Sequence, residues 1–145
     1  MPEEKQPSVR PLAAGDGALD ETPSRRQTIL VVDGEEIVRK TIGFIFQQRT
    51  GYKVVGAIDG RQAQAIFASH ASELALLIVE ITLPKLSGPD FVNHLPTLAP
   101  RIPVLFITGM GGYEVPGEIS RQFPVLQKPF KADALLTAVK PFLQA

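Results

Sequence analysis

Five side chains that can carry or bind charge stand at the ends of short apolar runs in this sequence. Asp33 and Glu35 follow the first run closely, and Glu80, Thr108 and Lys128 follow three later ones. A carboxylate pairs with an ammonium group and accepts hydrogen bonds from a hydroxyl group. If the fold brings these ends together, Glu80 can pair with Lys128 or accept a hydrogen bond from Thr108. The chain has no cysteine, which excludes disulfides, thiolate metal sites and thiol catalysis.

The apolar runs themselves are typical of short β-strands. Those at 28–32, 74–79 and 103–107 are apolar at nearly every position, as expected for a parallel sheet covered on both faces. The run at 53–58 is more mixed, which favours the edge of the sheet, and a further run lies at 124–127. We therefore expect five strands.

Between the expected strands, apolar residues recur at helical spacing. The stripes consist of Val38, Thr41, Ile42 and Ile45, then Ala63, Ile66 and Phe67, and finally Leu135, Leu136, Val139, Phe142 and Leu143. Asp59 and Ser87 are predicted to cap helix starts, because their side chains can accept hydrogen bonds from the free amides of a first turn. A shortened helix is expected after Pro116, and Pro141 should end the last helix near Lys140.

The alternation of strands and helices predicts an α/β fold, with a doubly wound parallel sheet and helices on both faces. In such sheets, ligands bind beyond the carboxyl ends of the strands, where the strand order reverses. Asp33, Glu80, Thr108 and Lys128 all stand at expected strand ends. We therefore predict that they share one crevice, with Pro129 beside Lys128.

Size and composition predict one folded domain with a disordered tail. The chain has 145 residues, of which 44% are apolar, and this is enough for a single core. Residues 1–27 contain almost no large apolar side chains and are expected to be disordered, whereas 28–145 form the domain. Basic and acidic residues number 15 each, so neither nucleic acid nor membrane is expected as a partner. No apolar run approaches a membrane span, and a cytoplasmic location is expected.

Four segments, taken in order, resemble the signature blocks of response-regulator receiver domains of two-component signalling. They read ILVVDGEEIVRK, LLIVEITLPKLSG, VLFITG and LQKPF, and the resemblance extends over essentially 28–145. The resemblance implies a flavodoxin-like five-stranded sheet of order 2-1-3-4-5 and a protein that is not an enzyme. It also implies a histidine kinase or another signalling protein as the partner, and a monomer or weak homodimer.

The resemblance assigns roles to four residues. In that family, an acidic pair after the first strand and an aspartate after the third hold Mg²⁺, and the aspartate accepts a phosphoryl group from a histidine kinase. Asp33 matches the first acid, and Thr108 matches the hydroxyl that binds the phosphoryl group. Lys128 matches the lysine that pairs with this group, and Pro129 matches the proline that follows a cis peptide bond.

Three positions depart from the family's pattern. Gly34 replaces the second acid, Glu80 replaces the phosphoacceptor aspartate, and Val125 replaces an aromatic switch residue. Mg²⁺ requires nearly octahedral oxygen ligands, so a metal site of Asp33 and Glu80 should be weak or absent, and no cofactor is expected. Phosphorylation of Glu80 is not expected either, because phosphoryl transfer depends on positioning and charge neutralisation.

Two interpretations of Glu80 stay open. Its carboxylate can imitate a phosphoryl group and bias the domain toward its signalling conformation, or it can merely neutralise Lys128 in a degenerate pocket. Glu35 is a further member of the acidic pocket. As an acid at the start of a helix, it is expected to serve the helix dipole and face solvent rather than bind a metal.

The leading functional hypothesis is a stand-alone receiver-like signalling module that acts through protein contact, since the sequence ends directly after the last predicted helix. One alternative is a single-domain response regulator that still accepts a phosphoryl group. Another is a flavodoxin-like protein that binds a small ligand, although the acidic stretch at 33–36 has the wrong sign for a phosphate-binding loop.

Overall fold

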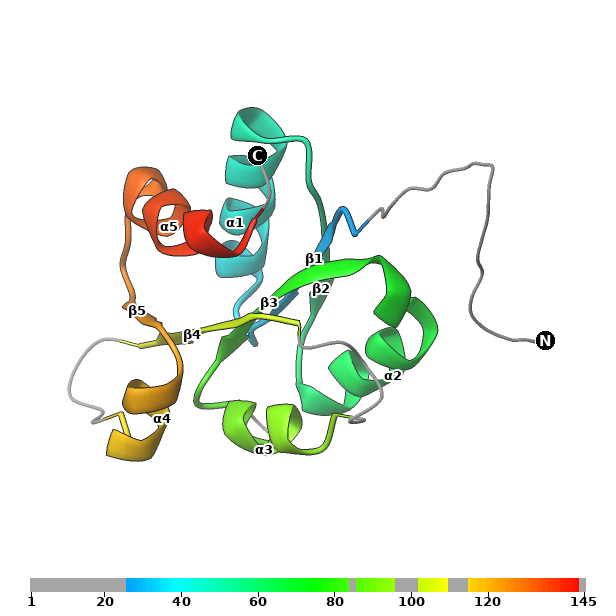
Figure 1. Ribbon diagram of the computed structural model, residues 1–145, viewed down its shortest axis with the longest axis vertical. Helices are drawn as coiled ribbons and strands as arrows, with labels where there is room; N and C mark the ends of the chain where they lie inside the picture. Colours follow the sequence, from blue (N-terminus) through cyan, green and yellow to red (C-terminus); the bar gives the residue numbers. More distant parts are fainter. Residues whose placement is uncertain (1–25, 84–85, 96–101, 110–114, 144–145) are drawn as a thin grey trace.

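A computed structural model describes residues 26–83, 86–95, 102–109 and 115–143, which contain a five-stranded parallel sheet (Figure 1). The strands are β1 (Thr28–Val32), β2 (Lys53–Ala57), β3 (Leu74–Glu80), β4 (Val104–Thr108) and β5 (Val125–Gln127). Their order is β2-β1-β3-β4-β5, and every neighbouring pair is parallel. The more polar run, β2, lies at the edge as predicted. The predicted α/β fold with the flavodoxin-like strand order is confirmed.

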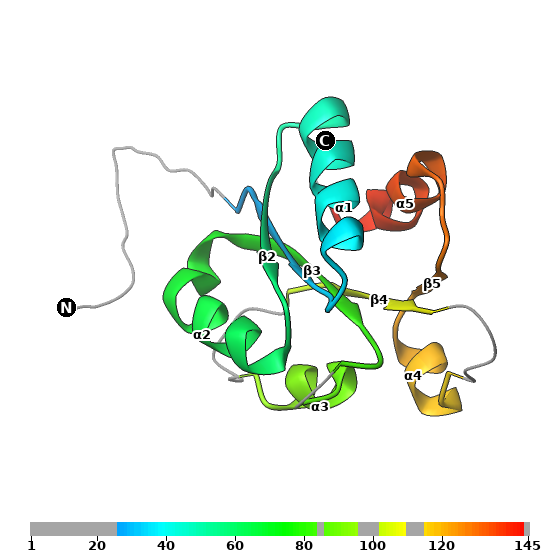
Figure 2. The ribbon, with the colours of Figure 1, turned by 180° about the vertical axis from the view of Figure 1, so that it is seen from behind.

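Helices cover both faces of this sheet (Figures 1 and 2). They are α1 (Glu36–Arg49), α2 (Gly60–His70), α3 (Gly88–Asn93), α4 (Gly117–Gln122) and α5 (Ala132–Val139), with 3₁₀ turns at Ala71–Glu73 and Lys140–Phe142. The helices α1 and α5 pack on one face, and α2, α3 and α4 lie on the other. The connection from β1 leads through α1 on one face, and the connection from β3 leads through α3 on the other, so the strand order reverses between β1 and β3.

Alternate residues of the central strands pack into two separate cores. On one face of the sheet, Leu30 of β1 lies in a buried cluster with Phe91 of α3. On the other face, Ile29 lies in a cluster with Phe46 of α1 and Leu135 of α5. Burial of one large apolar side chain stabilises a fold by about 1.5 to 3 kcal/mol. Because both faces are covered, the carboxyl ends of β1 and β3 are held in fixed positions.

The two predicted helix caps are confirmed. The Asp59 carboxylate accepts a hydrogen bond from the backbone amide of Gln62 at 2.8 Å, and the Gln62 side chain accepts one from the amide of Ile58 at 2.7 Å. The Ser87 hydroxyl accepts a hydrogen bond from the amide of Asp90 at 3.2 Å. These bonds satisfy amides that a helix start leaves without an intrahelical partner.

Prolines determine the helix boundaries in the last third of the chain. Helix α4 begins directly after Pro116 and has 6 residues, so the expected shortening is confirmed. Helix α5 ends at Val139, and Pro141 lies in the 3₁₀ turn that follows. A proline inside an α-helix removes one hydrogen bond and clashes with the preceding turn, which explains this end.

The predicted disordered tail lies mostly outside the described residues, at 1–25. Its last two residues are described and contact the domain. The Arg26 guanidinium donates hydrogen bonds to the carbonyls of Ala71 and Leu74, each at 3.0 Å. Gln27 is the residue before β1, and its carbonyl accepts a hydrogen bond from the amide of Lys53 at 2.9 Å.

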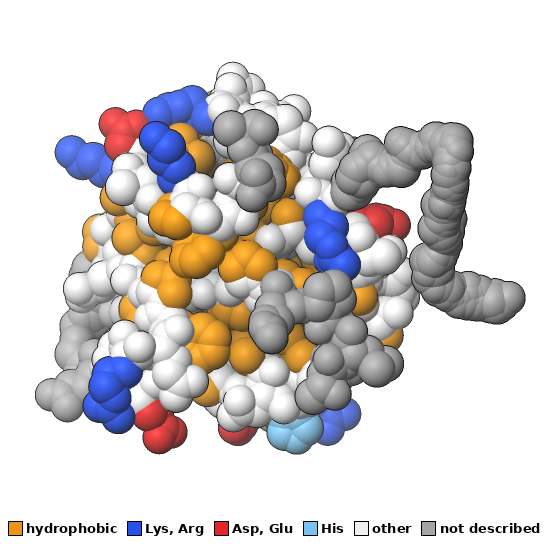
Figure 3. Space-filling model, viewed as in Figure 1, with side chains coloured by type: hydrophobic (Ala, Val, Ile, Leu, Met, Phe, Trp, Pro, Cys, Tyr) orange, Lys and Arg blue, Asp and Glu red, His pale blue; other side chains and the backbone are white. Residues whose placement is uncertain are grey.

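One face of the molecule has a band of hydrophobic side chains between α5 on one side and α3 and α4 on the other (Figure 3). Charged side chains lie mainly toward the margins of this face (Figure 3). Within the described ranges, no helix combines the length and the apolar character needed to cross a membrane. The cytoplasmic location stays a prediction.

Candidate functional site

The carboxyl ends of four strands bring the predicted site residues to one rim of the sheet. Asp33 directly follows β1, and Lys128 directly follows β5. Glu80 and Thr108 are the last residues of β3 and β4. Glu80 pairs in register with Ile107, so Thr108 is the next residue along the neighbouring strand. All four positions lie at this rim, and Asp33, Glu80 and Lys128 form one charged cluster there.

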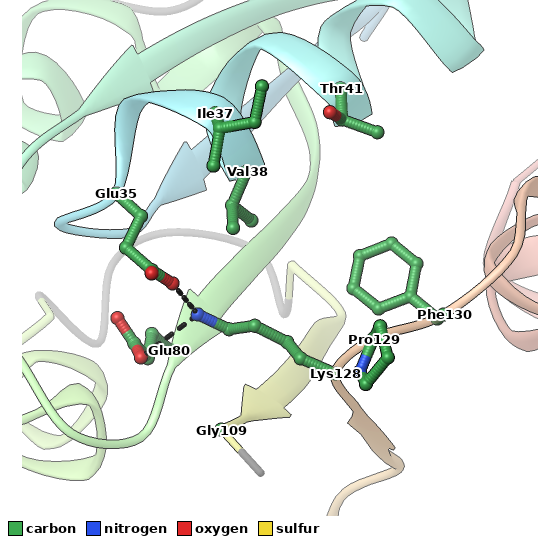
Figure 4. A pocket seen from close by; sticks show the side chains of 9 residues that line it. All are labelled: Glu35, Ile37, Val38, Thr41, Glu80, Gly109, Lys128, Pro129 and Phe130. Atoms are coloured by element: carbon green, nitrogen blue, oxygen red, sulfur yellow. Dashed lines mark hydrogen bonds and ion pairs between the residues drawn. The ribbon is translucent and has the colours of Figure 1, made fainter.

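The ammonium group of Lys128 lies among three carboxylates. Its Nζ is 2.7 Å from Glu35 Oε1, 3.0 Å from Asp33 Oδ2 and 3.1 Å from Glu80 Oε2. Figure 4 shows the contacts with Glu35 and Glu80. The Lys128 side chain is only 11% exposed, so these contacts are screened less by water than surface ion pairs are.

Asp33 is the most deeply buried of the three acids, with a side chain that is 0% exposed. Its Oδ1 accepts a hydrogen bond from the Glu35 amide at 2.8 Å, and its carbonyl accepts one from the Arg39 guanidinium at 2.7 Å. Its Oδ2 has no hydrogen bond from any described residue and is ion-paired with the Lys128 ammonium, 3.0 Å away. Burial of a carboxylate is costly unless it is paired, and Lys128 is the cation that pairs with Asp33 here.

Burial and crowding of charge shift the pKa values of two groups. The pKa of Glu80 is raised, first because its carboxyl group is withdrawn from water and second because Asp33 repels its charge. Lys128 opposes this rise without cancelling it. Burial acts to lower the pKa of Lys128, but its close contacts with the three acids and the charge of Asp33 outweigh burial and raise it. The pocket therefore holds a charged ammonium group for which three acids compete.

Thr108 and Pro129 position the backbone of Lys128. The Lys128 amide donates a hydrogen bond to the Thr108 carbonyl at 2.8 Å, which continues the pairing of β4 and β5 beyond the end of β5. The peptide bond between Lys128 and Pro129 is cis, as the family resemblance implied. Thr108 is buried, and among the described residues no hydrogen bond joins its hydroxyl to Glu80. Of the two partners expected for Glu80, the structure pairs it with Lys128.

Glu35 faces solvent as expected, with a side chain that is 61% exposed, and the structure adds a partner for it that the sequence did not predict. Glu35 is the N-cap residue of α1, but its side chain makes no capping hydrogen bond. It contacts Lys128 at 2.7 Å instead. A full positive charge at this distance attracts a carboxylate more strongly than the partial charges of a helix end do. The side chain is 61% exposed, so Glu35 is the outermost member of the cluster.

A groove of about 570 Å³ opens beside the charged cluster (Figure 4). Its lining combines Glu35, Glu80 and Lys128 with an apolar wall that consists of Ile37, Val38, Pro129 and Phe130. Thr41 also lines the groove and is exposed, so the predicted apolar stripe that includes it does not face the core at this position. It lies about 100° around α1 from the buried Ile42. Sequence reasoning missed this groove, because only the tertiary structure sets α1 against the loop after β5.

A magnesium ion, which the family resemblance implies, needs a cluster of oxygen ligands. Asp33, Glu35 and Glu80 each offer a carboxylate oxygen, and these atoms lie within 4.8 Å of one another. Such oxygens suit Mg²⁺. However, the Lys128 ammonium lies within 3.1 Å of an oxygen of each acid, and Gly34 offers no side chain. The three carboxylates are therefore of the type that Mg²⁺ prefers. However, Lys128 occupies the space between them, so no ion can contact all three acids in this arrangement.

Known proteins share both the sequence pattern and the fold. The response regulator receiver domain family matches residues 29–140. The chain is 28% identical over 148 aligned positions to the sensor kinase CckA of Brucella abortus (strain 2308), which covers 98% of this chain and 15% of that protein. It is also 28% identical over 120 positions to sporulation initiation phosphotransferase F of Bacillus subtilis (strain 168), covering 81% of this chain and 94% of that protein.

Among solved structures, the receiver domain from the hybrid histidine kinase CckA is 32% identical, with a TM-score of 0.67. That likeness covers 81% of this chain and 99% of the other. The chain spans about half the length of several curated relatives that it matches, and less of the sensor kinase. Because the family match covers most of the chain and the strand order agrees with it, this chain belongs to the response regulator receiver domain family of two-component signalling.

Proposed function

We propose that this chain is a stand-alone receiver module in which Glu80 imitates the phosphorylated state, and that it signals through contact with another protein. The observation that carries the proposal is the ion pair between Lys128 Nζ and Glu80 Oε2, at 3.1 Å. In the family, the matching lysine pairs with the phosphoryl group. Here the longer glutamate side chain supplies an anion directly. Because a carboxylate has less charge than a phosphoryl group, the imitation is partial.

Phosphorylation of Glu80 is not part of this proposal. Phosphoryl transfer is catalysed by positioning and by neutralisation of charge on the transferred group. Glu80 is one methylene longer than aspartate, its Oε2 is engaged by Lys128, and Gly34 removes one acid from the metal site. Each of these features works against an efficient acceptor.

The proposed partner is a histidine kinase or another signalling protein, and no nucleic acid is proposed. One similar protein is, by name, a sensor kinase, and one similar structure is a receiver domain from a hybrid histidine kinase. The groove beside the cluster offers a contact surface, since Ile37 on its wall is 70% exposed. A protein bound there would contact Lys128. A change in the position of the ammonium group would therefore change this contact. The match to 94% of phosphotransferase F, a relative of similar extent, supports a receiver that acts alone.

A response regulator that still accepts a phosphoryl group is the second candidate. The name of that same relative, a phosphotransferase, is the observation in its favour. The flavodoxin-like ligand-binding alternative gains no support, because the carboxylates at the rim would repel a phosphate group.

Incubation with acetyl phosphate and Mg²⁺, followed by intact mass measurement, separates the two candidates. We expect no stoichiometric acid-labile adduct on the natural chain, and an adduct on the double variant Gly34→Asp/Glu80→Asp. A side chain at position 34 is sterically feasible, since an added Cβ would meet only the Ile58 carbonyl, at 3.8 Å. A stoichiometric adduct on the natural chain would favour the second candidate.

Backbone hydrogen exchange tests the imitation itself. In 102–109 and 115–130, the natural chain should resemble the phosphorylated double variant more than the unphosphorylated one. Glu80→Gln keeps the shape of the side chain and removes its charge, so its exchange pattern should differ from that of the natural chain. Identical patterns for the natural chain and Glu80→Gln would mean that Glu80 only fills the pocket.

A further inference from the structure

A second groove, of about 640 Å³, lies between α1 and the start of β2 and shares no lining residue with the groove beside the charged cluster. We call it the α1–β2 groove, and its walls include the side chains of Lys40, Phe44, Gln47, Tyr52, Lys53 and Val54. We infer that this groove binds residues 16–21 of the chain's own N-terminal segment. The inference goes beyond the proposed function, because no residue of the charged cluster takes part in it.

The α1–β2 groove combines an exposed aromatic ring with two positive charges. Phe44 is 63% exposed. The cations are Lys40 and Lys53, and among the described residues no acid lines the groove. Lys40 pairs with Glu36 at 3.0 Å, whereas no carboxylate of the described ranges pairs with Lys53. The groove therefore favours an occupant that is both apolar and acidic.

The N-terminal segment contains a stretch of this kind. Residues 11–24 include three acids, Asp16, Asp20 and Glu21, and no lysine or arginine. Leu19, directly before the last two acids, adds a large apolar side chain. A segment of this composition has no core of its own, so its leucine is shielded from water only by contact with the domain. The leucine matches the exposed ring of the groove, and the acids match its two lysines.

The segment joins the domain beside this groove. Thr28 pairs in register with Lys53, and the Gln27 carbonyl accepts a hydrogen bond from the Lys53 amide at 2.9 Å. The stretch from Leu19 to Gln27 can extend over roughly 26 Å. The segment therefore ends next to a lysine of the groove and is long enough to fold back into it.

Tethering makes even a weak contact effective. A short flexible linker holds a segment near its site at an effective concentration on the order of 1 mM. A contact with a dissociation constant of about this size is then occupied about half of the time. The groove beside the charged cluster competes poorly for the same segment, because Glu35 and Glu80 line it and would repel the acids.

Paramagnetic relaxation enhancement tests the inference in the full chain. The chain has no cysteine, so Ala18→Cys provides a single position for a nitroxide label. We expect the amide signals of Phe44 and Lys53 to lose at least about half of their intensity. The signals of Gly109 and Phe130, in the other groove, should keep theirs. A mixture of spin-labelled chains with separate isotope-labelled chains detects contacts between copies, and no loss is expected there.

Changes in the segment itself leave the domain untouched and test the apolar contact. Leu19→Ser should remove most of the signal loss at Phe44. Val9→Ser is the matched control, because it removes an apolar side chain from the same segment but outside the acidic stretch. It should leave the signal loss unchanged.

Reversal of charge tests the ion pairs. Lys53→Glu should remove most of the signal loss, and adding Asp20→Lys and Glu21→Lys to the same chain should restore most of it, because opposite charges then face each other again. Lys131→Glu is the control, since it reverses the same charge at an exposed position that does not line the α1–β2 groove. If Lys53→Glu folds poorly, Asp20→Asn/Glu21→Gln gives the same test from the side of the segment.

Three results would overturn the inference. The first is an unchanged intensity of Phe44 and Lys53 in the labelled chain. The second is a signal loss that persists in Leu19→Ser. The third is an equal signal loss in the mixture, which would mean that the segment contacts a second copy. None of these readouts depends on phosphorylation or on Glu80, so failure here is distinct from failure of the proposed function.

Discussion

The Nζ of Lys128 and Oε2 of Glu80 lie 3.1 Å apart, although the two residues are 48 positions apart in the chain. They stand at the ends of β5 and β3, which β4 separates in the sheet. Their contact therefore crosses the carboxyl end of β4. It holds the loop after β5 against the carboxyl end of β3. A change of charge at Glu80 would act on this loop, on Pro129 and on the groove beside them.

Glu80→Gln should raise the free energy of unfolding at neutral pH by on the order of 1 kcal/mol. The pKa of Glu80 is raised in the folded protein, mainly by burial. The folded state therefore binds this proton more readily than the unfolded chain does, and stability falls as the pH rises through the raised pKa. A neutral amide avoids this loss.

The gain should disappear near pH 3, because the carboxyl group is then protonated in both states. Denaturant unfolding of both chains at neutral and at acidic pH measures the effect. A less stable Glu80→Gln at neutral pH would mean that the ion pair with Lys128 outweighs the cost of burying the charge.

Lys128→Met should lower the free energy of unfolding by about 3 to 5 kcal/mol in the absence of metal ions. It leaves Asp33 Oδ2 buried without a cation. The exposed control Lys131→Met should change stability by about 0.5 kcal/mol or less. Thermal and denaturant unfolding in the presence of a chelator compare the two variants, and equal effects would contradict the central position of Lys128.

The same lysine predicts a pH dependence of the natural chain. Its pKa is raised in the folded state, because the three acids outweigh the effect of burial. The stabilisation that it provides is therefore complete at neutral pH and is lost as the pH rises from the ordinary lysine pKa toward the raised one. Unfolding across the alkaline range should show this loss in the natural chain and not in Lys128→Met.

Gly88→Ala should destabilise the fold by about 1 to 3 kcal/mol, because the added methyl group overpacks the loop that follows β3. A Cβ at this position would clash with the carbonyl oxygen of Glu80, so the backbone that carries Glu80 must move. Gly51→Ala is the control, since nothing lies within 4 Å of a Cβ there. Similar melting temperatures for the two variants would show that the backbone around Gly88 shifts at little cost in stability.

Asp59→Ala should cost about 1 kcal/mol through loss of the N-cap of α2. The Asp59 carboxylate accepts the hydrogen bond from the Gln62 amide at 2.8 Å. Asp59→Asn retains a side-chain oxygen in the same place and should recover most of the stability. If Asp59→Asn lowered stability as much as Asp59→Ala, the charge of Asp59 and not its hydrogen bond would stabilise the start of α2.

Local sequence determined most of the elements, because strands, caps and helix ends depend on neighbouring residues. The strand predicted at 28–32 has those bounds, and Asp59 and Ser87 cap α2 and α3 as expected. The strand predicted at 74–79 extends one residue further, to Glu80, because Glu80 pairs with Ile107 of β4. That pairing cannot be inferred from the run of apolar residues alone.

The sequence by itself also determined which residues stand at the strand ends, since a parallel sheet places all these ends at one rim. Only the tertiary structure decided how they pair. Glu35 turns from the start of α1 toward Lys128, 93 positions away, and Thr41 faces the groove instead of the core. The physical reason is that one ammonium group attracts every nearby carboxylate, and which carboxylates are near depends on how distant segments pack.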